Sequence, residues 1–119
     1  MILEDGVEEL LDREVAQRYA SWFRALADPT RVQIAELLAR RREPMSVGQI
    51  TAAMGLAQST VSQHLKILAE VRFVLVEAAG NANLYRINEN CLDHFPTAAD
   101  VVMGRPVATP GDAARRQAG

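Results

Sequence analysis

The residues that decide the fold run from Ser46 to Leu68 and read SVGQITAAMGLAQSTVSQHLKIL. Ser46 and Gln49 have the spacing of a capping box, in which each side chain satisfies a free backbone N–H at the start of a helix. Gly55 readily adopts the left-handed conformation that ends a helix. The pattern therefore predicts a short helix that ends at Gly55 and, after a short turn, a second helix over residues 58–70. Two short helices joined in this way are typical of a helix-turn-helix.

The predicted helix 58–70 has two chemically different faces. At about 100 degrees per residue, the apolar Val61, Leu65 and Leu68 fall on one side. The other side carries hydroxyls, an amide and one cation, from Ser59, Ser62, Gln63 and Lys66. Solvated helix faces usually carry long charged side chains, whereas hydroxyls and amides suit base edges and phosphates. We interpret this face as one that reads DNA, and an ordinary polar face is the alternative.

Two further helices are predicted upstream. Apolar residues at intervals of three and four predict a long first helix over residues 7–27, with Leu11, Val15, Tyr19, Trp22 and Leu26 on one face. Asp28 is a good N-cap and Pro29 suits the first helical position. A second helix should therefore begin there and end in the arginines at 40–42, which the helix dipole favours at a C-terminus.

Downstream, residues 73–76 and 84–87 predict two strands, and turn-forming residues lie between them. A hairpin that follows a helix-turn-helix is a wing. We expect a short helix over 89–95, which Pro96 interrupts or restarts, and another turn or two over 97–103.

From composition and pattern we expect the chain to divide into an acidic lead-in over 1–14, a winged helix-turn-helix domain over 7–103 and a disordered tail over 104–119. The predicted fold class is mainly α with a small β-hairpin, in the order α-α-α-α-β-β-α.

Charge and cysteine usage exclude several classes of protein. The formal net charge of -2 over 119 residues comes from the first fourteen residues, which carry -5, whereas residues 15–90 carry +3. The single cysteine cannot form an intrachain disulfide or a usual structural zinc site. No apolar run approaches the roughly 18 residues that span a bilayer. We therefore expect one small cytoplasmic domain that does not contact membranes.

Three segments resemble the ArsR/SmtB family of winged helix-turn-helix regulators. They are FRALADPTR at residues 23–31, QSTVSQHLKIL at 58–68 and Tyr85-Arg86-Ile87, and the resemblance covers about residues 16–95. It implies a dimeric bacterial repressor that binds an inverted-repeat operator in double-stranded DNA. It further implies that the helix over 58–70 enters the major groove and that the first and last helices form the dimer interface.

The resemblance also assigns residues to these roles. DNA contact would fall to Gln58, Ser59, Thr60, Ser62, Gln63, His64 and Lys66, and to Arg86 in the wing. The dimer interface would use Leu11, Val15, Tyr19, Trp22, Leu92 and Phe95.

The usual metal sites of the family are absent or incomplete. Ser46-Val47-Gly48 stands where a Cys-x-Cys pair is common, and the last helix lacks a second His or Glu ten to thirteen residues after its first ligands. Cys91, Asp93 and His94 could still bind nickel or zinc as an effector, especially if a dimer brings two sets together. The alternative is that Cys91 is a small buried hydrophobe and His94 a surface residue.

Three departures from the family concern DNA binding. Ala57 occupies the expected N-cap of the helix over 58–70, where a hydroxyl would contribute about 1 kcal/mol. Arg72 stands where related chains often have glycine, so it is expected to take a positive φ. The predicted wing has Arg86 as its only cation, which predicts weak phosphate contact.

The sequence bears on two other functional classes. A winged-helix module that dimerises or docks on protein without reading DNA would share the same fold. An enzyme is disfavoured, because Ser62 and His64 are two positions apart on a helix and point in different directions, so they cannot form a catalytic dyad.

Overall fold

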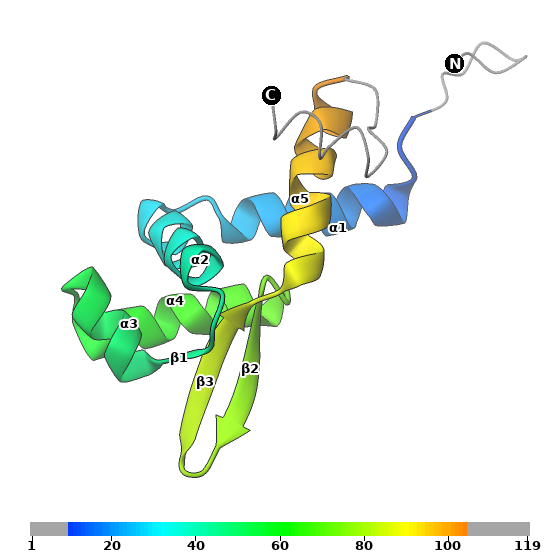
Figure 1. Ribbon diagram of the computed structural model, residues 1–119. Coiled ribbons are helices and arrows are strands. Elements are labelled where there is room, and N and C mark those ends of the chain that lie inside the picture. The colour runs from blue at the N-terminus through cyan, green and yellow to red at the C-terminus, as the bar shows by residue number, and fades with distance from the viewer. Residues whose placement is uncertain (1–9, 105–119) are drawn as a thin grey trace, which may run out of the picture.

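The computed structural model describes residues 10–104, and the predictions made for 1–9 and 105–119 lie outside them. The described chain forms five helices and three strands (Figure 1). In order these are α1 (Arg13–Ala25), α2 (Pro29–Arg41), β1 (Met45–Ser46), α3 (Val47–Met54), α4 (Gln58–Glu70), β2 (Val74–Ala79), β3 (Ala82–Ile87) and α5 (Glu89–Val102). The predicted winged helix-turn-helix is confirmed, with one additional strand.

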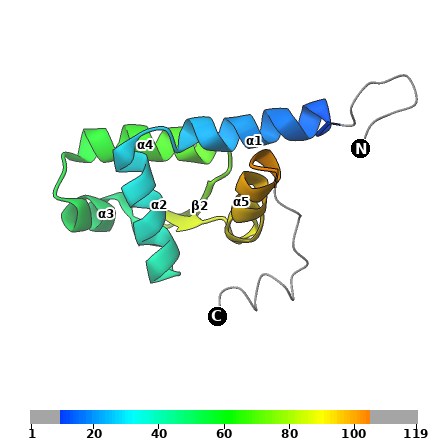
Figure 2. The same cartoon turned by 90° about the horizontal axis from the view of Figure 1, so that it is seen from above.

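The hydrophobic core lies between α2, α3, α4 and the sheet. Its largest fully buried side chains are Ile34, Leu38, Ile50, Leu65, Leu68, Val61 and Val74. Both views place α3 at one end of the molecule and α1 with α5 at the other (Figures 1 and 2). The hairpin of β2 and β3 projects away from the helices (Figure 1). No helix in residues 10–104 is long and apolar enough to cross a membrane.

Helix α1 is shorter than the predicted helix over 7–27. Its N-cap is Asp12, whose carboxylate accepts a hydrogen bond from the Glu14 N–H at 3.1 Å. Residues 10–12 are not helical, and 7–9 lie outside the described residues. The sequence pattern missed this start because the apolar interval continues through Leu11 although the side chain of Asp12 satisfies the first free N–H groups.

The predicted ends of α2 and α3 are confirmed. Asp28 caps α2 with Pro29 at its first turn. Ser46 and Gln49 form the capping box of α3, with N···O distances of 3.1 and 2.9 Å. Gly55 ends α3 at φ 69°, a conformation that favours glycine. These local signals fix the angle at which α4 leaves the turn.

The sheet has three strands in the order β1-β3-β2, rather than the two of the predicted hairpin. Met45 pairs with Tyr85 and Ser46 pairs with Leu84, both antiparallel. A strand of two residues directly before a helix carries no alternating pattern, so the sequence did not indicate it. Strands β2 and β3 are also longer than predicted, because only two residues separate Ala79 from its partner Ala82.

Helix α5 runs without a break through Pro96, so the prediction that Pro96 interrupts or restarts the helix is wrong. Proline costs a helix one backbone hydrogen bond and crowds the preceding turn. Packing offsets this cost, because the ring of Phe95 lies 5.1 Å from that of Phe23 and 5.6 Å from that of Phe73. The Thr97 hydroxyl also donates to the Asp93 carbonyl at 3.5 Å.

Candidate nucleic-acid interface

Helix α4 buries one face and exposes the other, as its sequence pattern predicts. Val61, Leu65 and Leu68 are completely buried. Six of the seven side chains of α4 predicted to contact DNA are exposed, namely Gln58, Ser59, Thr60, Ser62, Gln63 and Lys66. Within residues 10–104 these six side chains form no hydrogen bond or ion pair, so their polar atoms are available to a ligand. We call them the α4 polar face.

His64 is the exception among the predicted DNA contacts on α4. It is half-buried, and its Nδ1 lies 3.2 Å from Nη1 of Arg31 at the start of α2. Nε of the same arginine donates to the carbonyl of Ala25, the last residue of α1. The structure therefore separates His64 from the α4 polar face and gives it a protein partner. Sequence analysis missed this pair because its members are 33 positions apart.

Asp28 supplies the negative charge beside this pair. Its Oδ1 accepts hydrogen bonds from the backbone N–H groups of Arg31 at 3.2 Å and Thr30 at 2.8 Å. The pKa of the Asp28 carboxyl is lowered, first by the hydrogen bond from Arg31 and then by that from Thr30 and the charges of His64 and Arg31, against an opposing effect of partial burial. The N-terminus of α2 therefore presents an ionised carboxylate and a guanidinium to α4.

The wing cation is also paired within the chain. Nε of Arg86 on β3 lies 2.8 Å from Oε1 of Glu77 on β2, and both side chains remain partly exposed. A phosphate must therefore compete with Glu77 for Arg86. This pairing weakens the wing further as a source of electrostatic affinity, in the direction the sequence predicts.

The two backbone departures expected at α4 are present. Ala57 is the N-cap of α4, and no side-chain hydrogen bond caps the helix there. Arg72 follows α4 at φ 59°. The Arg72 carbonyl accepts a 2.8 Å hydrogen bond from Asn88, and it lies 3.7 Å from the Cys91 sulfur. These bonds hold the strained residue against the start of α5.

The predicted metal ligands do not converge within one chain. Cys91 is 4% exposed with its sulfur directed toward Arg72, whereas Asp93 and His94 are exposed. Burial raises the pKa of the Cys91 thiol, which disfavours the thiolate that binds metals. In the described part of the chain, no three His, Cys, Asp or Glu residues are grouped so that they could hold a metal ion. A site shared between two subunits stays a prediction.

The residues predicted for dimerisation lie on α1 and α5, except for Leu11, which precedes α1. Tyr19 and Trp22 stack with ring centroids 5.6 Å apart, and Trp22 lies 6.4 Å from Phe95. Leu11 is 40% exposed, Val15 is half-buried, and Leu92 lies on α5. The structure adds three exposed residues that were not expected from the sequence, namely Leu10 at 78%, Val102 at 59% and Met103 at 77%. This end of the molecule thus carries uncovered apolar surface.

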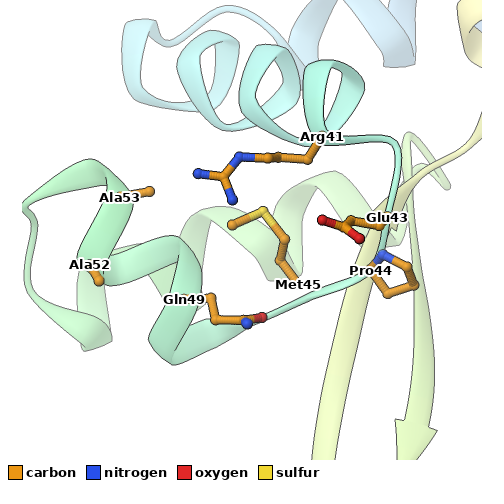
Figure 3. A pocket seen from close by; sticks show the side chains of 7 residues that line it. All are labelled: Arg41, Glu43, Pro44, Met45, Gln49, Ala52 and Ala53. Carbon is orange, nitrogen blue, oxygen red and sulfur yellow. The ribbon is translucent and has the colours of Figure 1, made fainter.

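A separate open depression of about 520 Å³ lies between α2, β1 and α3 (Figure 3). Arg41, Glu43 and Gln49 supply its polar groups, and Met45, Pro44, Ala52 and Ala53 complete its lining. None of these residues belongs to α4. The depression is therefore distinct from the α4 polar face.

A family model and curated relatives match this chain. The model described as "Bacterial regulatory protein, arsR family" matches residues 28–75, which span α2 to the start of β2. The chain is 35% identical over 82 residues to a transcriptional repressor SmtB homolog from Synechocystis, covering 69% of this chain and 61% of that protein. It is 33% identical over 111 residues to the transcriptional regulator KmtR of Mycobacterium tuberculosis, covering 93% and 82%.

A solved structure is similar over most of the chain. It is the homodimeric winged helix-turn-helix DNA-binding domain of a possible ArsR-family transcriptional regulator from Mycobacterium bovis. The TM-score is 0.62 at 30% sequence identity, and the match covers 77% of this chain and 86% of that one. The similarity extends beyond the segment that the family model matches.

Proposed function

Because this chain belongs to the ArsR family of bacterial regulatory proteins, we propose that it is a homodimeric transcriptional repressor that binds double-stranded operator DNA. The relatives reported above are named as regulators or repressors and not as enzymes, which agrees with the sequence analysis. A regulator of this kind works where the bacterial chromosome lies, in the cytoplasm.

The observation that carries the proposal is the α4 polar face. Its hydroxyl, amide and ammonium groups project from the second helix of a helix-turn-helix, and the described chain leaves them without partners. Such a helix enters the major groove, where amides and hydroxyls bond base edges. The first turn of α4 can also receive a phosphate at its free N–H groups, because no side chain caps it.

Dimerisation follows from the apolar surface on α1 and α5. The half-buried aromatic side chains of Tyr19, Trp22 and Phe95 and the exposed Val102 and Met103 would be covered by a second copy. A two-fold axis through this surface sets two α4 helices on one side of the dimer. The operator is then an inverted repeat whose half-sites are about one helical turn, about 10 base pairs, apart.

Selection of duplexes from a random pool by the full chain tests this function. The expected result is enrichment of an inverted repeat with that spacing, bound by a dimer in sedimentation, with affinity that falls as salt rises. A dimer that enriches no sequence would instead support the second functional class, a winged-helix interaction module. An enriched single site without a repeat would contradict the dimeric arrangement.

We further propose that a divalent metal, nickel or zinc, modulates operator binding through Cys91, Asp93 and His94 in a site shared between the two subunits of the dimer. Support comes from the donor set, since sulfur, carboxylate and imidazole suit borderline metals. Competitive metal titration of the dimer, with operator affinity as the readout, tests it. If metal changes the operator affinity by at most a few fold, the coupling free energy between metal and DNA binding is below about 1 kcal/mol. That result would reject metal sensing.

A further inference from the structure

The side chain of Arg31 joins three helices at one point. Its Nε donates to the last carbonyl of α1, at Ala25, over 2.5 Å, and its Nη1 lies 3.2 Å from Nδ1 of His64 on α4. Its backbone N–H lies in the first turn of α2 and donates to Asp28. Hydrogen bonds from its backbone N–H and from its Nε therefore hold Arg31 in place, and its Nη1 is then directed at α4.

Donor chemistry sets which protonation state of His64 this contact requires. A guanidinium has five donors and no acceptor, so Nδ1 must be the acceptor and the ring proton must be on Nε2. A second proton on Nδ1 would remove the acceptor and place two cations side by side. The contact therefore exists only with neutral His64.

The charged groups that face His64 come from the start of α2. They are the guanidinium of Arg31, which opposes a positive charge on His64, and the ionised carboxylate of Asp28, which favours one. From α1, the carbonyl of Ala25 accepts a hydrogen bond from Arg31 and so acts on His64 only through that residue. On α4 itself the positions three and four away from His64 are Thr60, Val61, Ile67 and Leu68, all uncharged.

In residues 10–104, the bond from Arg31 is the one side-chain hydrogen bond between α4 and another helix, in addition to the backbone bonds that its last turn accepts from Arg72 and Phe73. In residues 10–104 no other side chain forms a hydrogen bond to α4, and Ala57 leaves its start uncapped. The buried Val61, Leu65 and Leu68 hold the helix by apolar contact, which depends weakly on orientation. A hydrogen bond weakens steeply with misalignment, so it specifies how far α4 is rotated and thus where Ser62 and Gln63 point.

We propose that Arg31 is a positioning residue for α4, acting through neutral His64, and that acidification weakens operator binding by releasing this contact. The inference rests on the DNA-binding function proposed above. It also reverses the role expected of His64 from the sequence. A histidine that contacts phosphate binds more tightly when protonated, whereas one that accepts from Arg31 positions α4 only when neutral.

The test measures affinity of the full chain for its selected operator between about pH 8 and about pH 5.5, the interval in which histidine side chains commonly change charge. For the wild type we expect a loss of about tenfold on acidification, the size of one lost hydrogen bond to a charged group. His64→Asn keeps an acceptor near the Nδ1 position and does not titrate. It should bind like wild type at pH 8 and lose that pH dependence.

Two further variants separate positioning from charge. Arg31→Gln should weaken operator binding at pH 8 by about tenfold more than Arg41→Gln, which removes the same charge from the exposed end of α2. Nitrogen NMR of the imidazoles gives a readout without DNA. In the wild type at pH 8, His64 should carry its proton on Nε2, and Arg31→Gln should shift its signals but not those of the exposed His94.

Three results would overturn the inference. They are an affinity that rises on acidification in the wild type but not in His64→Asn, a pH dependence that His64→Asn retains, or Nδ1 of His64 protonated at pH 8. These results differ from the result expected if the proposed DNA-binding function is wrong, because the wild type would then select no DNA sequence at any pH. If Arg31→Gln unfolds, the His64→Asn profile and the NMR signals of the wild type still decide.

Discussion

Ala57 and Arg72 bracket α4, and each departs from the residue that its backbone position favours. Ala57 offers no oxygen to the free N–H groups of the first turn. Arg72 takes φ 59°, which costs an L-residue of this kind about 1 kcal/mol. At both ends of α4, therefore, the residue present stabilises the helix less than the residue type that its backbone position favours would.

Ala57→Ser should stabilise the protein by about 1 kcal/mol, because its hydroxyl can accept from the N–H of the second or third residue of α4. Urea unfolding at one fixed protein concentration measures this, since dimerisation makes stability depend on concentration. Ala53→Ser is the control, because it adds a hydroxyl to an exposed position near the end of α3. Equal free energies of unfolding for both variants would contradict the account of the cap.

For single residues, the sequence predicts those features that depend on residues nearby in the chain. The capping box at Ser46 and the uncapped Ala57 could be inferred from local pattern, and the positive φ of Arg72 from the family resemblance. The contact of Arg31 with His64 could not, since each residue alone fits a solvent-exposed or DNA-facing role. Only the crossing of α2 over α4 brings the two side chains together.

At the scale of elements, α5 shows packing prevailing over local propensity. Pro96 should end or kink the helix, yet Glu89–Val102 is continuous. Phe95 packs on rings from α1 and from the segment before β2, which holds both halves of α5 in one direction. Strand β1 is a similar case, because its two residues become a strand only through pairing with β3. Neither the continuity of α5 nor the existence of β1 could be predicted from the residues of that element alone.

Phe95→Ala should lower the free energy of unfolding by about 2 kcal/mol, less than for a fully buried ring because Phe95 is half-buried. Pro96→Ala at the neighbouring exposed position should not lower it, because alanine restores a helical N–H. Thermal and urea unfolding at matched concentrations compare the two. A loss in Pro96→Ala as large as that in Phe95→Ala would show that the proline, not the aromatic cluster, holds α5.

At the scale of the whole molecule, the apolar surface and the polar surface lie on different elements. Exposed apolar side chains lie just before α1 and at the end of α5, whereas the α4 polar face belongs to the helix-turn-helix. The apolar interval in the sequence already selected α1, and the chemistry of residues 58–66 selected α4. The relative placement of the two surfaces required the fold, since α1 and α5, which build the apolar surface, lie at opposite ends of the described chain and α4 lies between them in sequence.

Arg31 connects these surfaces through the carbonyl of Ala25, where α1 ends. A shift of α1 in the dimer would therefore reach α4 through one side chain. The net charge of -2 does not oppose DNA binding at this scale, because residues 15–90, which hold the helix-turn-helix and the wing, carry +3.

If the α4 polar face reads operator sequence, Gln63→Ala should remove base discrimination, because it deletes the side-chain amide at the centre of that face. Affinity for the selected operator is measured against a scrambled duplex, with the exposed Gln33→Ala on α2 as the control. We predict that Gln63→Ala lowers the ratio of the two affinities by about tenfold or more. Its dimer and its affinity for scrambled DNA should match those of the control. A ratio equal to that of the wild type would contradict the account.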